Sequence, residues 1–263
     1  LRNIKTYIDK MVPYDEEETA YILFTSGSTG LPKGVQIKFK NVKSFIDWTT
    51  KEYSITSSDI FLTQVPFTFD LSVLDLYCSF TKGSKVVLCS KDSSLNFANL
   101  SRKIVENNVS IIYSTPSFLK LLSFSGDFRK LASSQLKTIL ICGEVLSIKT
   151  AKRLFNICVN AKIYNLYGPT ETNVVTSFQI NDEALMSEEL PIGTAVSNYR
   201  LMVLDSEFNM VPDGCEGQLV VQGDSLAEGY FKESRKTSEV FKRISANENR
   251  TYFTGDKVIK IGD

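Results

Sequence analysis

Short apolar runs alternate with stretches of helical periodicity along the first two thirds of the chain. The apolar runs predict strands at Tyr21–Phe24, Val35–Ile37, Ile60–Val65, Val86–Leu88, Val109–Tyr113, Thr138–Cys142 and Lys162–Leu166. The periodic stretches predict helices at Asn41–Tyr53, Leu95–Glu106, Pro116–Leu122 and Ser147–Ile157, with one more beginning near Asp70. Such alternation is typical of a mostly parallel sheet flanked by helices. Ligands of these sheets bind at the carboxyl ends of the strands.

The pattern changes after about Pro191. Strand-like runs at Leu201–Leu204, Gln218–Gln222 and Thr251–Phe253 are separated by turn sequences instead of helices. We therefore predict an α/β core over residues 1–190 and a smaller β-rich, barrel-like subdomain over residues 191–263. The charged segment Leu1–Glu18 is expected to be a partly helical lead-in.

Composition excludes several classes of function. The 263 residues are 43% hydrophobic and 23% charged, as in globular domains, and 30 basic residues balance 30 acidic ones. A net charge of zero gives no general electrostatic attraction to nucleic acid or to an anionic membrane. No apolar run has the length of a membrane span, and Lys5, Asp9 and Lys10 interrupt any signal peptide. We expect a cytoplasmic protein that binds no nucleic acid.

The absence of histidine narrows the chemistry further. Mechanisms that need an imidazole base, such as a Ser-His-Asp triad, are excluded within this chain. The cysteines are odd in number and contain no C-x-x-C pair, which argues against a disulfide framework and a structural zinc site. They are Cys78, Cys89, Cys142, Cys158 and Cys215.

A loop rich in glycine and hydroxyl groups follows the first predicted strand. It contains Thr25, Ser26, Gly27, Ser28, Thr29 and Gly30, and it ends near Lys33. Successive main-chain N–H groups in such a turn form a concavity for phosphate, and the lysine adds a positive charge. The Walker pattern does not fit, because Pro32 stands where its second glycine belongs and Gly34 follows Lys33. A solvent-exposed Gly/Ser-rich turn is the alternative.

The run T-S-G-S-T-G-x-P-K-G-V resembles the phosphate-loop motif of the adenylate-forming enzymes. This superfamily includes acyl-CoA synthetases, luciferases and the adenylation domains of peptide synthetases. Three later segments resemble further motifs of the superfamily in the same order, namely Asn165–Glu171, Gly217–Tyr230 and Tyr252–Asp256. The resemblance implies the fold of the large N-terminal domain, and it implies ATP and Mg2+ as cofactors.

The resemblance also implies roles for single residues around the triphosphate. The loop from Thr25 to Lys33 would hold the β and γ phosphates, Thr170 would contact phosphate, and Glu171 would bind Mg2+. A carboxylate is the ligand type that Mg2+ prefers. The alternative for Glu171 is a carboxylate that stabilises the start of a helix.

A second group of residues is assigned to the nucleoside. Asn165 and Tyr167 would lie beside the adenine, together with the pair Gly143-Glu144. Asp256 would accept both ribose hydroxyls, which suits a charged acceptor. An aspartate after a glycine is otherwise an ordinary turn residue.

Asp70 is the candidate for recognition of the acyl substrate. It lies in F-D-L-S-V, a motif that supplies the carboxylate for the substrate ammonium in amino-acid-activating members. The alternative for Asp70 is a helix N-cap. The wider sequence is similar to the D-alanine–carrier-protein ligases, in which a cysteine at the place of Cys142 narrows the pocket and favours D-alanine. The alternative for Cys142 is an ordinary small buried residue.

The resemblance therefore predicts ATP-dependent activation of a small amino acid, with D-alanine favoured, for transfer to the phosphopantetheine thiol of an acyl or peptidyl carrier protein. The alternatives are an adenylation domain for another amino acid and a non-catalytic nucleotide-binding remnant. Because Asp263 lies just before the family's hinge, we expect a fragment that lacks the C-terminal domain and its lysine.

Overall fold

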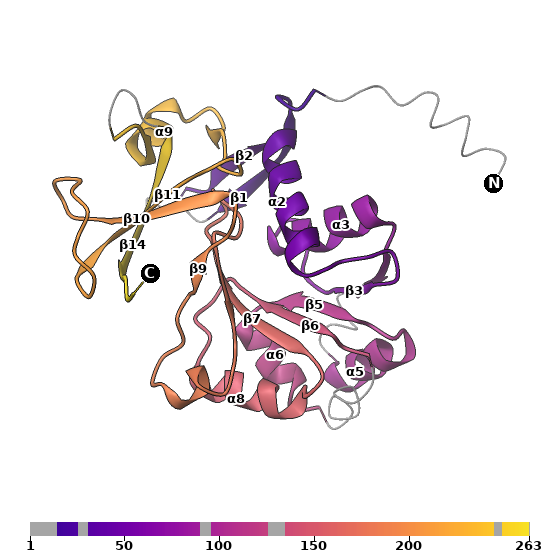
Figure 1. Ribbon diagram of the computed structural model, residues 1–263. Coiled ribbons are helices and arrows are strands. Elements are labelled where there is room, and N and C mark those ends of the chain that lie inside the picture. The colour runs from indigo at the N-terminus through magenta and orange to yellow at the C-terminus, as the bar shows by residue number, and fades with distance from the viewer. Residues whose placement is uncertain (1–14, 26–30, 90–95, 126–134, 245–248, 263) are drawn as a thin grey trace.

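The computed structural model describes residues 15–25, 31–89, 96–125, 135–244 and 249–262 (Figure 1). Its largest sheet has seven strands. Its strand order is β4-β3-β5-β6-β7-β8-β9. The first five of these strands run parallel to their neighbours, and β8 and β9 are antiparallel additions at one edge. The strands are β3 (Ile60–Thr63), β4 (Lys85–Leu88), β5 (Ile111–Ser114), β6 (Thr138–Ile141), β7 (Lys162–Tyr167), β8 (Thr176–Gln179) and β9 (Thr194–Ala195).

Helices cover both faces of this sheet because its strands are apolar on both sides. Alternate strand residues belong to two separate cores: Tyr113 and Leu140 pack with the helices on one face, whereas Ile112 and Ile139 pack with those on the other. The first face is covered by α2 (Phe39–Glu52) and α3 (Leu71–Lys82). The second is covered by α5 (Phe97–Glu106), α6 (Pro116–Leu122) and α8 (Ile148–Ile157), as Figure 1 shows.

Two smaller antiparallel sheets lie beside the central one. The first has the order β1-β2-β12 and the second β10-β11-β14-β13. Their strands are β1 (Thr19–Thr25), β2 (Lys33–Lys38), β10 (Tyr199–Leu204), β11 (Glu216–Gly223), β12 (Gly229–Tyr230), β13 (Phe241–Lys242) and β14 (Thr251–Ile259). One hydrophobic core joins all three sheets, since it contains Ile37 of β2, Phe61 of β3 and Val221 of β11.

The predicted α/β fold class, with a parallel-rich sheet and an antiparallel β-rich part, is confirmed. The predicted strands and helices within the described residues all appear, with ends that differ by a few residues. The sequence pattern did not predict β8, β9, β12, β13, the helix α9 (Ser234–Val240) or the short 3-10 helix η1 (Ala184–Met186). The boundary near residue 190 stays a prediction, and most of the lead-in, residues 1–14, lies outside the described residues.

Among the helices that the structure describes, none combines the length and apolarity needed to cross a membrane.

Candidate active site

The loop that follows β7 is the centre of the site. It doubles back tightly: the Thr172 N–H donates to the Pro169 carbonyl at 2.9 Å, and the Val175 N–H donates to the Tyr167 carbonyl at 2.8 Å. Gly168 is required here, because a Cβ on it would lie 1.8 Å from the Asn173 carbonyl oxygen. This close approach holds the next residues, Thr170 and Glu171, at the carboxyl end of the parallel sheet, where such folds bind ligands.

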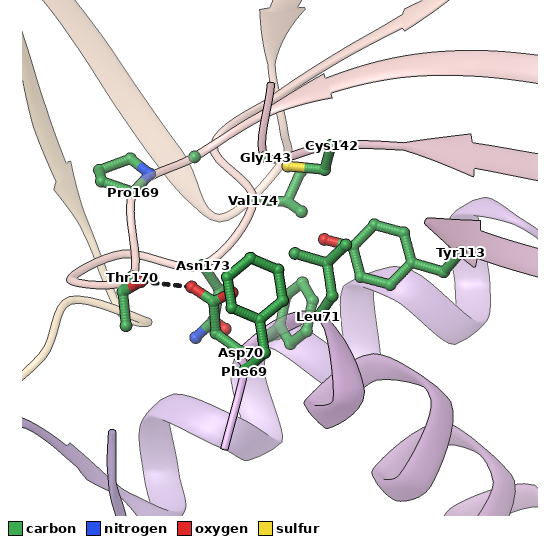
Figure 2. Close-up of a pocket in the computed structure, with 12 residues that line it drawn as sticks. Phe69, Asp70, Leu71, Tyr113, Cys142, Gly143, Pro169, Thr170, Asn173 and Val174 are labelled. Atoms are coloured by element: carbon green, nitrogen blue, oxygen red, sulfur yellow. Dashed lines mark hydrogen bonds between the residues drawn. The ribbon is translucent and has the colours of Figure 1, made fainter. Parts of the chain in front are cut away.

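Thr170 lies against the start of α3. Its hydroxyl donates a hydrogen bond to Oδ2 of Asp70 (Figure 2). Asp70 occupies the N-cap position of α3, yet its side chain makes no capping hydrogen bond to that helix. Burial raises the pKa of Asp70 above its ordinary value, and the hydrogen bond from Thr170 opposes this shift. The Asp70 carboxylate therefore faces the loop after β7.

A cavity of about 220 Å³ opens beside Asp70 (Figure 2). This is below the roughly 300–1,000 Å³ that is usual for drug-sized ligands, so the space suits a small substrate. Cys142, at the end of β6, is 4% exposed, and burial raises the pKa of its thiol to about 12, which keeps it neutral. The remaining lining residues are Phe45, Phe69, Leu71, Tyr113, Gly143, Gly168, Pro169, Thr170, Asn173 and Val174.

Gly143 forms part of this wall in a backbone conformation that favours glycine, with φ of +90°. The next residue, Glu144, is exposed and accepts hydrogen bonds from the main-chain N–H and the hydroxyl of Ser117 in the first turn of α6. Gly143 of the predicted pair thus lines the cavity, and the role of the pair Gly143-Glu144 beside the adenine stays a prediction.

Glu171 and Lys33 meet through a tyrosine. The Tyr230 hydroxyl donates to Glu171 Oε1 at 2.7 Å, and Lys33 Nζ donates to the same hydroxyl at 3.2 Å. Glu171 is 6% exposed and Tyr230 is 5% exposed. Lys33 Nζ also lies 4.3 Å from the centroid of the Tyr230 ring, a cation–π distance. Lys33 and Glu171, which are 138 positions apart in the sequence, therefore form hydrogen bonds with the same hydroxyl group.

Tyr167 and Asp256 form a second pair, in which the Tyr167 hydroxyl donates to Asp256 Oδ2. Asp256 projects from a bulge in β14. Gln218 of β11 pairs with Lys257, but Val220 pairs with Phe253, so β14 holds two extra residues at this point. Burial, followed by the hydrogen bond to Asp256, raises the pKa of Tyr167 above its ordinary value, so the phenol is a neutral donor.

Asn165 is one of the buried residues of β7, and its side-chain Nδ2 donates to the Pro191 carbonyl at 2.9 Å. Its predicted place beside the adenine stays a prediction.

The predicted phosphate loop connects β1 to β2. Thr25 is the last residue of β1 and pairs in register with Lys33, the first residue of β2. The lysine therefore stands at the base of the loop, next to the site. The loop residues Ser26, Gly27, Ser28, Thr29 and Gly30 lie outside the described residues.

Comparison with known proteins identifies the family. A family model described as "AMP-binding enzyme" matches residues 4–231. The chain belongs to the AMP-binding enzyme family. The resemblance drawn from the loop and the three later motifs is thus confirmed.

Two curated relatives are similar over almost the whole chain. The D-alanine–D-alanyl carrier protein ligase of Listeria monocytogenes serotype 4b is 40% identical over 258 residues, which is 97% of this chain and 50% of the ligase. The ligase of the same name from Bacillus mycoides is 37% identical over 242 residues, which is 91% of this chain and 48% of the ligase. The chain thus spans about half the length of these curated relatives.

The fold is also shared with a solved structure. A four-domain nonribosomal peptide synthetase, determined with AMP and glycine bound, superposes with a TM-score of 0.85 at 27% identity. The match covers 97% of this chain and 18% of the synthetase.

Several residues of the site were not predicted from the sequence. Tyr230 was part of a quoted motif, but nothing in the pattern assigned a contact to it. Tyr113, Phe45 and Val174 line the cavity, yet each lies in an apolar segment that the pattern explains by packing alone. Only the fold shows that their strands, helices and loops converge on one space.

Proposed function

We propose that this chain takes part in the ATP-dependent activation of a small amino acid, with D-alanine favoured, for transfer to the phosphopantetheine thiol of a carrier protein. The observation that carries the proposal is the Asp70 carboxylate beside a small cavity, joined by one hydrogen bond to Thr170 of the nucleotide motif. The names of the two relatives and the bound ligands of the solved synthetase support it.

The chemistry needs positioning more than acid–base catalysis. In the first step a carboxylate oxygen of the amino acid attacks the α-phosphorus of ATP. The bond from that phosphorus to the oxygen bridging it to the β-phosphorus breaks, and pyrophosphate leaves with the electron pair. In the second step the carrier thiolate attacks the acyl carbon and AMP leaves. Since the substrate carboxylate is itself the nucleophile, no imidazole base is needed, which suits a chain without histidine.

The residues of the site divide this work. Lys33, at the base of the phosphate loop, supplies positive charge for the phosphates. The one O–H of Thr170 donates to Asp70, so its predicted contact with phosphate would replace that hydrogen bond. Tyr167 offers a flat ring to the adenine, and Asp256 beside it offers a carboxylate to the ribose hydroxyls. Asp70 pairs with the ammonium of the amino acid, because an unpaired charge in a partly buried site is unfavourable.

The residues present fit a magnesium ion. The described residues contain no cluster of three acidic, cysteine or histidine side chains that would bind a metal alone. Mg2+ commonly uses one or two protein carboxylates and completes its shell with phosphate oxygens and water. The buried carboxylate of Glu171, next to Lys33 and Tyr230, has the chemistry for that single contact. When bound, the ion would neutralise charge on the phosphates.

Amino-acid-dependent exchange of labelled pyrophosphate into ATP tests the proposal in the full chain. D-alanine is expected to support the fastest exchange among D-alanine, L-alanine, glycine and serine. In the Cys142→Gly variant the preference for the D-enantiomer should shrink, because the wall beside the substrate loses its thiol. Exchange that depends only on long-chain or aryl acids would refute the amino-acid assignment. Nucleotide binding without exchange by any acid would favour a non-catalytic remnant.

A peptide-synthetase adenylation domain for another small amino acid is the second candidate. The observation in its favour is the likeness to the synthetase determined with AMP and glycine. The same exchange panel separates the two, because glycine or serine would then be faster than D-alanine.

A further inference from the structure

Tyr230 stands between the two oppositely charged side chains of the phosphate site. Its hydroxyl donates to Glu171 at 2.7 Å and accepts from Lys33 at 3.2 Å. The same hydroxyl is therefore a donor to one partner and an acceptor from the other. The ordinary pKa of a tyrosine phenol is about 10. The phenol therefore stays protonated at working pH and remains a neutral donor.

The main chain around Tyr230 is hydrogen-bonded to the segments that carry Lys33 and Glu171. In the β12–β2 pairing Tyr230 lies opposite Val35, and the Phe231 N–H donates to the Gly34 carbonyl at 2.7 Å, next to Lys33. On the other side the Ala227 N–H donates to the main-chain carbonyl of Glu171 at 2.8 Å. A segment of five residues thus joins the base of the phosphate loop to the loop after β7.

The ring of Tyr230 is held as firmly as its main chain. The ring packs edge-on against Phe241, with centroids 6.2 Å apart. The main-chain N–H of Tyr230 donates to the Thr237 hydroxyl at 2.9 Å. Tyr230 is 5% exposed. Packing thus helps to fix the position of the hydroxyl, in addition to its two hydrogen bonds.

A direct ion pair between Lys33 and Glu171 would work against nucleotide binding. The lysine charge is needed by phosphate and the glutamate charge by a cation, and a direct pair would have to be broken before either could bind. A neutral hydroxyl satisfies both groups by hydrogen bonds and leaves both charges in place.

We propose that Tyr230 is a positioning residue that keeps the Lys33 ammonium and the Glu171 carboxylate separate and correctly placed for the magnesium–triphosphate part of ATP. This inference rests on the proposed function, since it assumes that the site takes ATP. It predicts that the hydroxyl of Tyr230 affects magnesium-dependent ATP binding and leaves AMP binding unchanged.

Tyr230→Phe is the test variant, because it keeps the ring and the cation–π contact and removes only the hydroxyl. Calorimetric titration of the full chain with ATP at a series of Mg2+ concentrations, and with AMP alone, gives the readout. The affinity for MgATP should fall about 10- to 100-fold, as expected when a group that holds a metal ligand is lost. The Mg2+ concentration for half-maximal ATP binding should rise by a similar factor. AMP affinity should stay within about twofold.

Tyr53→Phe is a matched control. It also removes a buried hydroxyl, whose 3.2 Å hydrogen bond joins Ser177, but it lies outside the site. This variant should bind MgATP and AMP as the wild-type chain does. The losses from Lys33→Ala and Tyr230→Phe should not multiply in the double variant, because both act through one contact.

The outcomes separate this inference from the proposed function. If Tyr230→Phe binds MgATP with unchanged affinity and unchanged Mg2+ dependence, the positioning role is refuted even if amino-acid-dependent exchange is present. Equal losses for ATP and AMP would show a structural role only, and would also refute it. A wild-type chain that binds MgATP but exchanges pyrophosphate with no acid would refute the proposed function and leave the Tyr230 test intact. A wild-type chain that binds no MgATP would overturn both.

Discussion

The Asp70 carboxylate offers the sharpest test of substrate recognition, through Asp70→Ala and the isosteric Asp70→Asn. Both remove the charge that would pair with the substrate ammonium, and Asn keeps an acceptor for the Thr170 hydroxyl. A hydrogen bond to a charged group contributes about 1.5–3 kcal/mol, and breaking a fully buried ion pair costs about 3–5 kcal/mol. Since Asp70 is only partly buried, about 2–4 kcal/mol is expected. That corresponds to a loss of about 30- to 1,000-fold in kcat/KM for the amino acid.

The assay is amino-acid-dependent pyrophosphate exchange measured beside the melting temperature and the affinity for AMP. AMP affinity should not change, and the melting temperature should change little, because Asp70 makes no capping hydrogen bond to α3. If Asp70 acted as a helix cap, the variants would instead lose about 1 kcal/mol of stability with substrate affinity intact. That result would refute the assignment.

The pH dependence of the same reaction follows from the raised pKa of Asp70. The ammonium pairs with the ionised carboxylate, so KM for the amino acid should rise as pH falls through this pKa. The rise should begin above pH 3.9, the ordinary value for aspartate. Asp70→Asn has no such group and should show a flat KM over that range. Parallel profiles for wild type and Asp70→Asn would show that another group controls binding.

Three further variants test other parts of the structure. Lys33→Ala should weaken ATP binding about 10- to 100-fold, because a hydrogen bond from a charged group is lost, and it should leave AMP binding unchanged. Equal losses of ATP and AMP affinity would indicate that the loop is structural. Glu171→Gln keeps an acceptor for Tyr230 yet removes the charge, and pyrophosphate exchange should fall at least 10- to 100-fold. The carboxyl of Asp75 is fully buried, and this burial, which a contact with the Thr63 hydroxyl only partly offsets, raises its pKa well above the ordinary value. The folded state thus binds this proton more tightly than the unfolded state does. Asp75 therefore lowers the free energy of unfolding as pH rises. Asp75→Asn should raise the melting temperature at pH 7–8, with a gain that shrinks toward pH 4; a constant gain would contradict this.

Much of the fold could be predicted because its signals are local. The central strands are apolar runs that need no partner to be recognised, and α8 begins after a serine whose hydroxyl accepts from the Thr150 N–H. The strand β8, in contrast, reads Thr-Ser-Phe-Gln and has no apolar run. The two-residue strand β12 exists only because β2 pairs with it. Strands of this kind depend on a partner far away in the sequence.

The same distinction applies to the site. Lys33, Thr170, Glu171 and Asp70 could be proposed from the motifs that contain them. Their mutual contacts could not, because they join segments about 60 to 200 residues apart and depend on the packing of three sheets. Tyr230 is the clearest example, since its function as inferred here depends on which atoms lie on either side of one hydroxyl.

The three candidate site carboxylates have hydrogen-bond partners of a different kind from that of the buried Asp59. Asp59, 3% exposed, is neutralised by Lys137 at 2.7 Å, and its pKa is lowered despite burial. The candidate site acids pair with hydroxyl groups instead: Asp70 with Thr170, Glu171 with Tyr230, and Asp256 with Tyr167. A hydroxyl gives a carboxylate a hydrogen bond without neutralising its charge. An ammonium, a metal ion or a ribose that binds there therefore replaces only one hydrogen bond. Displacing a lysine from a buried pair would cost about 3–5 kcal/mol. Asp59 thus has a cation as its partner, whereas the three candidate carboxylates have neutral donors that leave their charge available to a ligand.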